Sequence, residues 1–121
     1  SDLIEKNYKV YPNCIMAKYY YMGLLASRIY QNGDLSMLPV VLDLWNNSLI
    51  ASGDIWVAKK GFPFIQDLYA ALLHNNVKLP GGELSIREYE NENKQKIQII
   101  ASSDKEFDLF LKIISNQSLT R

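Results

Sequence analysis

Hydrophobic residues recur at helical spacing most clearly in the first third of the chain. This stretch runs from Asn13, a residue type suited to capping a helix, to about Tyr30. One face of it carries apolar side chains at spacings of three and four: Ile15, Tyr19, Met22, Ala26 and Ile29. Asn32-Gly33 marks its end, because glycine is free to adopt a positive φ. The pattern therefore predicts one long N-terminal helix.

Three shorter helices are expected later in the chain. The first covers about residues 37–45, and the second starts near Pro63, with its proline close to the first helical position. The third covers residues 104–114, and Ser103 and Glu106 stand at the spacing of a capping box at its start. Each has an apolar stripe that can face a core.

Three other stretches favour β-strands. Residues 55–58 read IWVA and follow a Gly-Asp turn, which is typical of a short buried strand. Residues 83–89 and 96–101 carry apolar residues between polar ones, as in strands with one wet face. Residues 91–93 read NEN, so we expect them to form the turn of a hairpin. Pro80-Gly81-Gly82 predicts the turn that leads into it.

The expected order of elements is α-α-β-α-β-β-α, which is an α+β fold. We expect residues 1–121 to form a single compact domain, in which the long N-terminal helix packs on a small antiparallel sheet. Residues 1–12 and 116–121 have weak patterns, so these ends are expected to be poorly ordered.

The amino-acid composition limits the classes of partner that the chain can bind. The chain has 13 basic and 13 acidic residues, so it has no net attraction for nucleic acid or an anionic bilayer. No apolar run approaches the ~20 residues that span a membrane. Cys14 is the single cysteine, which excludes an intrachain disulfide and fits the cytosol without excluding an extracytoplasmic location. Its apolar neighbours predict that it is buried.

The chain is poor in catalytic groups. His74 is the only histidine, so a metal site built on several histidines is excluded. A Cys14–His74 dyad would suit a hydrolase, but no spacing supports it. Glu88, Glu90 and Glu92 could form an acid/base or metal cluster, and a solvated hairpin tip explains them better. We therefore expect no catalytic residue, no metal, no cofactor and no enzymatic activity.

Several short motifs resemble those of the PilM-type proteins of type IVB pilus systems. They are Tyr30–Gly33, Leu38-Pro39, Trp45-Asn46, Ile55–Val57 and Gly81–Leu84. The resemblance implies a pilin-like domain and a structural or assembly role in a bacterial type IV pilus-like apparatus. The implied partners are other protein subunits. The implied location is the periplasmic face of the inner membrane, reached through a membrane anchor upstream of Ser1.

Such a role requires an interaction surface, for which aromatic side chains near the IWVA stretch are candidates. They are Trp56, Phe62, Phe64 and Tyr69. Trp56 and Phe64 could instead belong to the core, and the outer edge of the expected hairpin is another candidate surface. The alternative function is a small cytoplasmic binding protein, such as an immunity protein, an antitoxin or a secretion chaperone. The sequence identifies neither the partner nor the oligomeric state.

Overall fold

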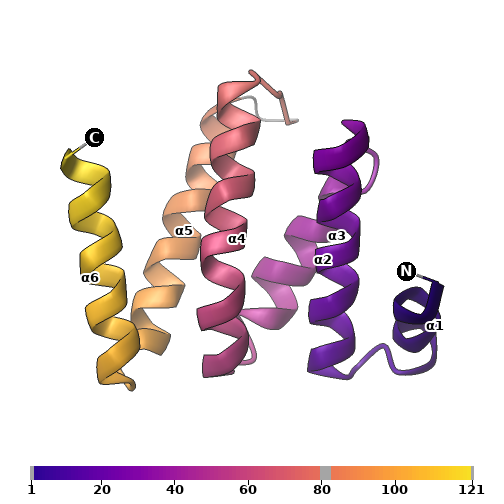
Figure 1. The fold of residues 1–121 in the computed structure, drawn as a ribbon, viewed down its shortest axis with the longest axis horizontal. Coiled ribbons are helices and arrows are strands. Elements are labelled where there is room, and N and C mark those ends of the chain that lie inside the picture. The colour runs from indigo at the N-terminus through magenta and orange to yellow at the C-terminus, as the bar shows by residue number, and fades with distance from the viewer. Residues whose placement is uncertain (1, 80–82, 121) are drawn as a thin grey trace. The chain divides into compact units, whose positions relative to one another are not determined.

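The structure, a computed structural model, describes the backbone of residues 2–79 and 83–120, and every regular element in these ranges is helical (Figure 1). Six α-helices and one π-helix follow one another in these two ranges. They are α1 (Asp2–Val10), α2 (Ile15–Asn32), α3 (Leu38–Asp43), η1 (Leu44–Leu49), α4 (Ile55–His74), α5 (Glu83–Ala101) and α6 (Lys105–Thr120). The predicted α+β class is therefore wrong, since neither described range contains a strand.

The helices belong to two compact units, Ser1–Val57 and Ala58–Arg121. In the first unit, α2 contacts α1, α3 and η1. Its core is formed by fully buried side chains of α2, α3 and η1, among them Met22, Leu25, Val41, Trp45 and Leu49. In the second unit, α5 contacts α6, and Tyr69, Ile86, Ile97 and Phe107 are buried.

The IWVA stretch is the first turn of α4, not a strand. Its misassignment has a physical cause, because four residues are too few to distinguish a period of two from one of 3.6. Over the whole helix the buried positions follow the helical period: Val57, Ala58, Phe62, Ile65, Leu68, Tyr69 and Leu72. Asp54 starts the helix by accepting the N–H of Val57 at 2.9 Å. Pro63, expected near a helix start, therefore lies inside α4.

The predicted hairpin is also wrong, because residues 83–101 form the single helix α5. Its buried positions are Ile86, Asn93, Ile97 and Ala101, and their spacings of seven, four and four define one helical face. The sequence pattern did not reveal this buried helical face because the residue in its middle, Asn93, is polar. Asn93 is 0% exposed although it falls in the expected turn. The preceding turn, expected at residues 80–82, lies outside the described residues.

Other boundaries agree more closely with the sequence pattern. The long helix α2 is confirmed, and Gly33 follows it in the left-handed region at φ 66°. Helix α4 ends at His74, and Asn76 follows with a positive φ of 55°. The helix expected at residues 37–45 continues as η1 to Leu49. At the ends, the structure places residues 2–10 in α1 and extends α6 to Thr120, whereas Arg121 is outside the described residues.

None of the described helices is long and apolar enough to cross a bilayer.

Helix α6 is capped by Asp104 instead of the expected Ser103. The carboxylate accepts the N–H of Phe107 at 3.0 Å, and Lys59 of α4 lies 3.0 Å from its other oxygen. The Phe107 N–H, and then Lys59, hold the pKa of Asp104 below its ordinary value. Capping and ion pairing therefore coincide at one carboxylate that joins α4 to α6.

We expect Asp104→Asn to lower the melting temperature most at neutral pH. The folded-state pKa is depressed, so the ionised carboxylate stabilises the fold above the unfolded-state pKa of about 3.9. That stabilisation is lost as the pH falls through the folded-state pKa, where the wild-type carboxylate becomes protonated. Thermal melts from pH 7 to pH 2 should show the gap between the two proteins closing below about pH 4. Asp67→Asn, at an exposed position of α4, is the control. A gap that stays constant down to pH 2 would contradict this assignment.

Candidate functional site

The four aromatic residues predicted to form an interaction surface have very different exposures. Trp56 is 44% exposed and lies in the first unit. Phe62 and Tyr69 are 5% and 0% exposed, so they are core residues of the second unit, and Phe64 is half-buried. Of these four residues only Trp56 therefore offers a large accessible ring, and it belongs to the first unit.

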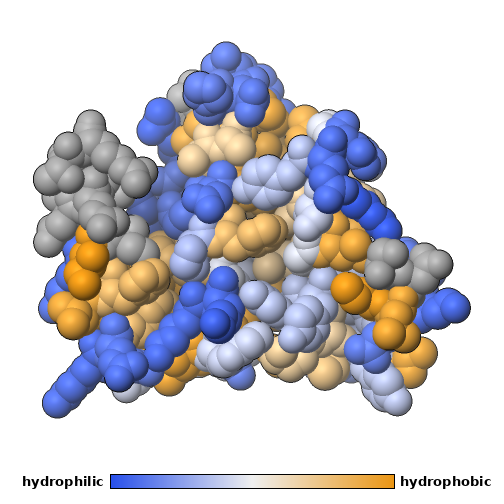
Figure 2. All heavy atoms as spheres, in the orientation of Figure 1, coloured by the Kyte–Doolittle hydropathy of each residue, from blue (hydrophilic) through white to orange (hydrophobic). Residues whose placement is uncertain are grey.

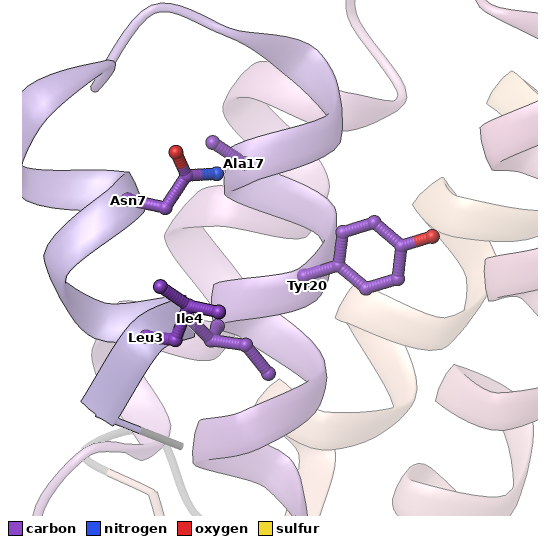
Figure 3. A pocket seen from close by; sticks show the side chains of 5 residues that line it. All are labelled: Leu3, Ile4, Asn7, Ala17 and Tyr20. Carbon is purple, nitrogen blue, oxygen red and sulfur yellow. The ribbon is translucent and has the colours of Figure 1, made fainter.

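A hollow of about 340 Å³ lies between α1 and α2 in that unit. Figure 3 shows Leu3, Ile4 and Asn7 on α1 and Ala17 and Tyr20 on α2. The first three belong to one face of α1, because residues three and four apart are neighbours on a helix. Asn7 supplies an amide within a lining that is otherwise mainly apolar. We call this feature the α1–α2 hollow.

Two contacts next to the hollow hold α1 against α2. The rings of Tyr8 and Tyr21 stack with centroids 4.3 Å apart and an interplanar angle of 9°. Arg28 and Glu5 lie 4.0 Å apart, at the limit of an ion pair, and their exposure makes this pair a weak contribution. The stacked tyrosines are therefore the stronger of these two contacts between α1 and α2.

An aromatic group continues from the hollow along α2. The ring of Tyr19 meets Tyr20 edge-on at 5.5 Å and Trp56 at 5.4 Å. Burial, and secondarily Tyr20, raise the pKa of the Tyr19 hydroxyl, so Tyr19 is neutral at physiological pH. Tyr20 both lines the hollow and belongs to the aromatic group, and its side chain is 50% exposed.

Helix α1 and the start of α2 carry several exposed apolar side chains. The exposed members are Leu3, Val10, Tyr11, Met16 and Tyr20. Figure 2 shows some of this apolar colour over α1, at the lower right of that view, next to hydrophilic residues, and apolar colour also appears over other helices. Together with the hollow and Trp56, these residues form what we call the α1–α2 surface. Clustered exposed apolar groups of this kind mark contact sites more often than isolated ones do.

The polar residues considered for catalysis do not assemble into a centre. Among the side chains that the structure describes, no three His, Cys, Asp or Glu residues are grouped as metal ligands. Cys14 was predicted to be buried and is exposed at the start of α2. His74 is the last residue of α4, and Glu90 pairs with Lys94 at 3.0 Å along α5. These placements supply no arranged nucleophile and base.

Sequence reasoning missed the contribution of α1, because residues 1–12 were expected to be poorly ordered. A signal was present, since Leu3, Ile4, Tyr8 and Tyr11 are spaced at one, four and three residues. Helix α1 has only nine residues and its apolar stripe is incomplete, so the pattern alone does not distinguish a helix from an irregular segment.

Comparisons of the chain with protein-family models, with curated proteins and with solved structures give no match. The functional assignment therefore depends on the chemistry and geometry of the α1–α2 surface.

Proposed function

We propose that this chain is a non-catalytic protein-binding domain and that its partner docks on the α1–α2 surface. One observation carries the proposal: Leu3 and Tyr20, 78% and 50% exposed, stand at the rim of an apolar hollow. A side chain that enters such a hollow buries its own apolar area together with that of both rim residues. Apolar burial is the main driving force of protein association.

The aromatic residues of this surface favour a specific contact. Tyr19 is fixed between Tyr20 and Trp56, so neighbouring rings already restrict these side chains before a partner arrives. Tyr and Trp have few rotatable bonds and lose little entropy on binding, which is why they are enriched among the residues that dominate binding energy.

A role as an assembly subunit of a type IV pilus-like apparatus is one specific form of this proposal. The resemblance implied a helix packed on a sheet, and the described ranges contain no sheet. The fold therefore does not support a role in a pilus-like apparatus. Binding through the α1–α2 surface does not depend on it, and a small cytoplasmic adaptor would use the same surface.

The test is photocrosslinking in the native host, with a benzophenone amino acid placed at residue 3 or residue 20. We expect both positions to capture the same partner. The double variant Leu3→Ser, Tyr20→Ser should lose at least about tenfold in capture from a neighbouring probe position, because it removes the apolar rim.

The matched control is Leu109→Ser, Phe110→Ser, which changes a similar pair, 60% and 42% exposed, on α6. This variant should retain the partner. Equal loss in the two double variants, or capture that is unchanged in both, would contradict the assignment of binding to the α1–α2 surface.

A further inference from the structure

The sequence contains a single Asn-Gly pair, Asn32-Gly33, and it lies at the end of α2. Both residues are exposed, and a Cβ added at Gly33 would meet no atom within 4 Å, so water reaches this peptide bond. The side-chain amide of an asparagine can be attacked by the backbone nitrogen of the next residue. Glycine hinders that attack least because it has no Cβ. Of the asparagines in this chain, Asn32 is therefore the one best placed by sequence to modify itself.

The C-cap of α2 restrains the nitrogen that would attack. Gly33 has a φ of 66° and a ψ of 15°, in the left-handed region that ends many helices. Its N–H donates to the carbonyl oxygen of Ile29 at 2.9 Å. This bond holds the proton that the nitrogen must lose before it attacks. Asn32 is the last residue of the helix, so its backbone torsions are fixed as well. The reaction therefore requires the last turn of α2 to open.

We propose that Asn32 is a self-modification site, at which the side-chain amide is lost whenever the C-cap of α2 opens. The Gly33 nitrogen gives its proton to water and forms a bond to Cγ of Asn32. The C–N bond of the side-chain amide breaks, and ammonia leaves. Water then opens the resulting cyclic succinimide at either of its two carbonyl carbons. One opening gives aspartate and the other gives isoaspartate, and each product carries a new carboxylate.

The two products have different effects on the cap. Aspartate keeps the length of the backbone, and its charge is unfavourable at the C-terminus of a helix, although Arg28 one turn earlier offsets part of this effect. Isoaspartate carries the main chain through the side-chain methylene, so the chain gains a carbon atom just before Gly33. That carbon displaces the Gly33 N–H from the carbonyl of Ile29, which it now meets at 2.9 Å. Formation of isoaspartate therefore removes the cap permanently.

The first test follows Asn32 by peptide mass spectrometry after the full chain has been incubated in mildly alkaline buffer, with and without denaturing urea. We expect loss of the amide in urea, and a rate at least about fivefold lower in the folded chain, because opening must break the cap hydrogen bond. Asn76, which precedes the β-branched Val77, is the internal control and should stay largely unmodified in both conditions. Equal rates at Asn32 in the two conditions, or no reaction in urea, would overturn the proposal.

Hydrogen exchange at the Gly33 amide tests the role of the cap separately. The same opening exposes this N–H to exchange and to the proton loss that begins the reaction. The folded chain should therefore slow both processes by the same factor, to within about threefold. Exchange that is protected far more strongly than the amide of Asn32 would show that the reaction proceeds with the cap closed, and would remove the proposed control by the cap.

The products themselves give the last test, once chromatography has separated them from the unmodified chain. We expect the isoaspartyl chain to exchange the Gly33 amide at least about fivefold faster than the unmodified chain. Asn32→Asp is the matched variant, because it has the same charge and a backbone of natural length, and it should retain most of the protection. An isoaspartyl chain that exchanges as slowly as Asn32→Asp would contradict the effect assigned to it. These results are independent of the α1–α2 surface, which is tested by its own crosslinks.

Discussion

Glu92→Pro is expected to lower the free energy of unfolding by about 3 kcal/mol or more. Glu92 is exposed in the middle of α5, so the substitution removes no buried contact. Its effect would come from the backbone, because proline cannot donate the hydrogen bond to the carbonyl four residues earlier and its ring collides with that carbonyl. Urea unfolding followed by far-ultraviolet circular dichroism would measure the loss.

Glu92→Ala separates this backbone effect from the loss of the carboxylate. Both variants remove the same charge, and alanine is at least as favourable as glutamate inside a helix, so Glu92→Ala should lie within about 0.5 kcal/mol of the wild type. The hairpin expected from the sequence gives the opposite result. Glu92 would then occupy a turn, where proline is tolerated. A Glu92→Pro protein as stable as Glu92→Ala would therefore restore the hairpin and contradict α5.

Leu25→Ala is the second large effect, and it concerns the first unit. Leu25 is 0% exposed on α2, and its truncation leaves a cavity that surrounding side chains only partly fill. We expect a loss of roughly 2–5 kcal/mol in unfolding free energy, measured by chemical denaturation. Because domains of this size are stable by only about 5–15 kcal/mol, the variant could lose much of its native population.

Leu3→Ala is the matched control for the core substitution. The same side chain is removed from the same unit, but at a position that is 78% exposed, so the change should stay within about 0.5 kcal/mol. Equal losses in the two variants would mean that α2 does not bury Leu25. The comparison also separates stability from binding, since Leu3 is at the proposed contact site and Leu25 is not.

The helical parts of the fold could be predicted where all members of a stripe were apolar. The pattern of α2 met this condition, and its start and end were placed within two residues. In α5 the stripe passes through Asn93, whose burial contradicts the usual exposure of asparagine. Without that residue, Ile86 and Ile97 look like members of two separate strands. In α4, the β-branched residues Ile55 and Val57 favoured a strand, whereas the Asp54 cap and the packing that follows favour a helix.

The candidate site was less predictable than the fold. Exposure decides whether an aromatic residue can bind a partner, and the sequence alone does not separate exposed Trp56 from buried Tyr69. The α1–α2 hollow requires two helices that the pattern could not bring together, since α1 was expected to be poorly ordered. The resemblance to pilus components concerned short motifs that lie in α2, α3, η1 and α4 and at residues 81–84, and such motifs do not specify what surrounds them.

The exposed thiol at the start of α2 has a practical consequence. Cys14 is the only cysteine of the chain, so maleimide dyes and nitroxide labels react at one known position without any mutagenesis. That position is three residues from Ala17 in the chain, and a label there would respond when the neighbouring hollow becomes occupied. The unmodified sequence therefore already contains the attachment point for a fluorescence or spin-label titration.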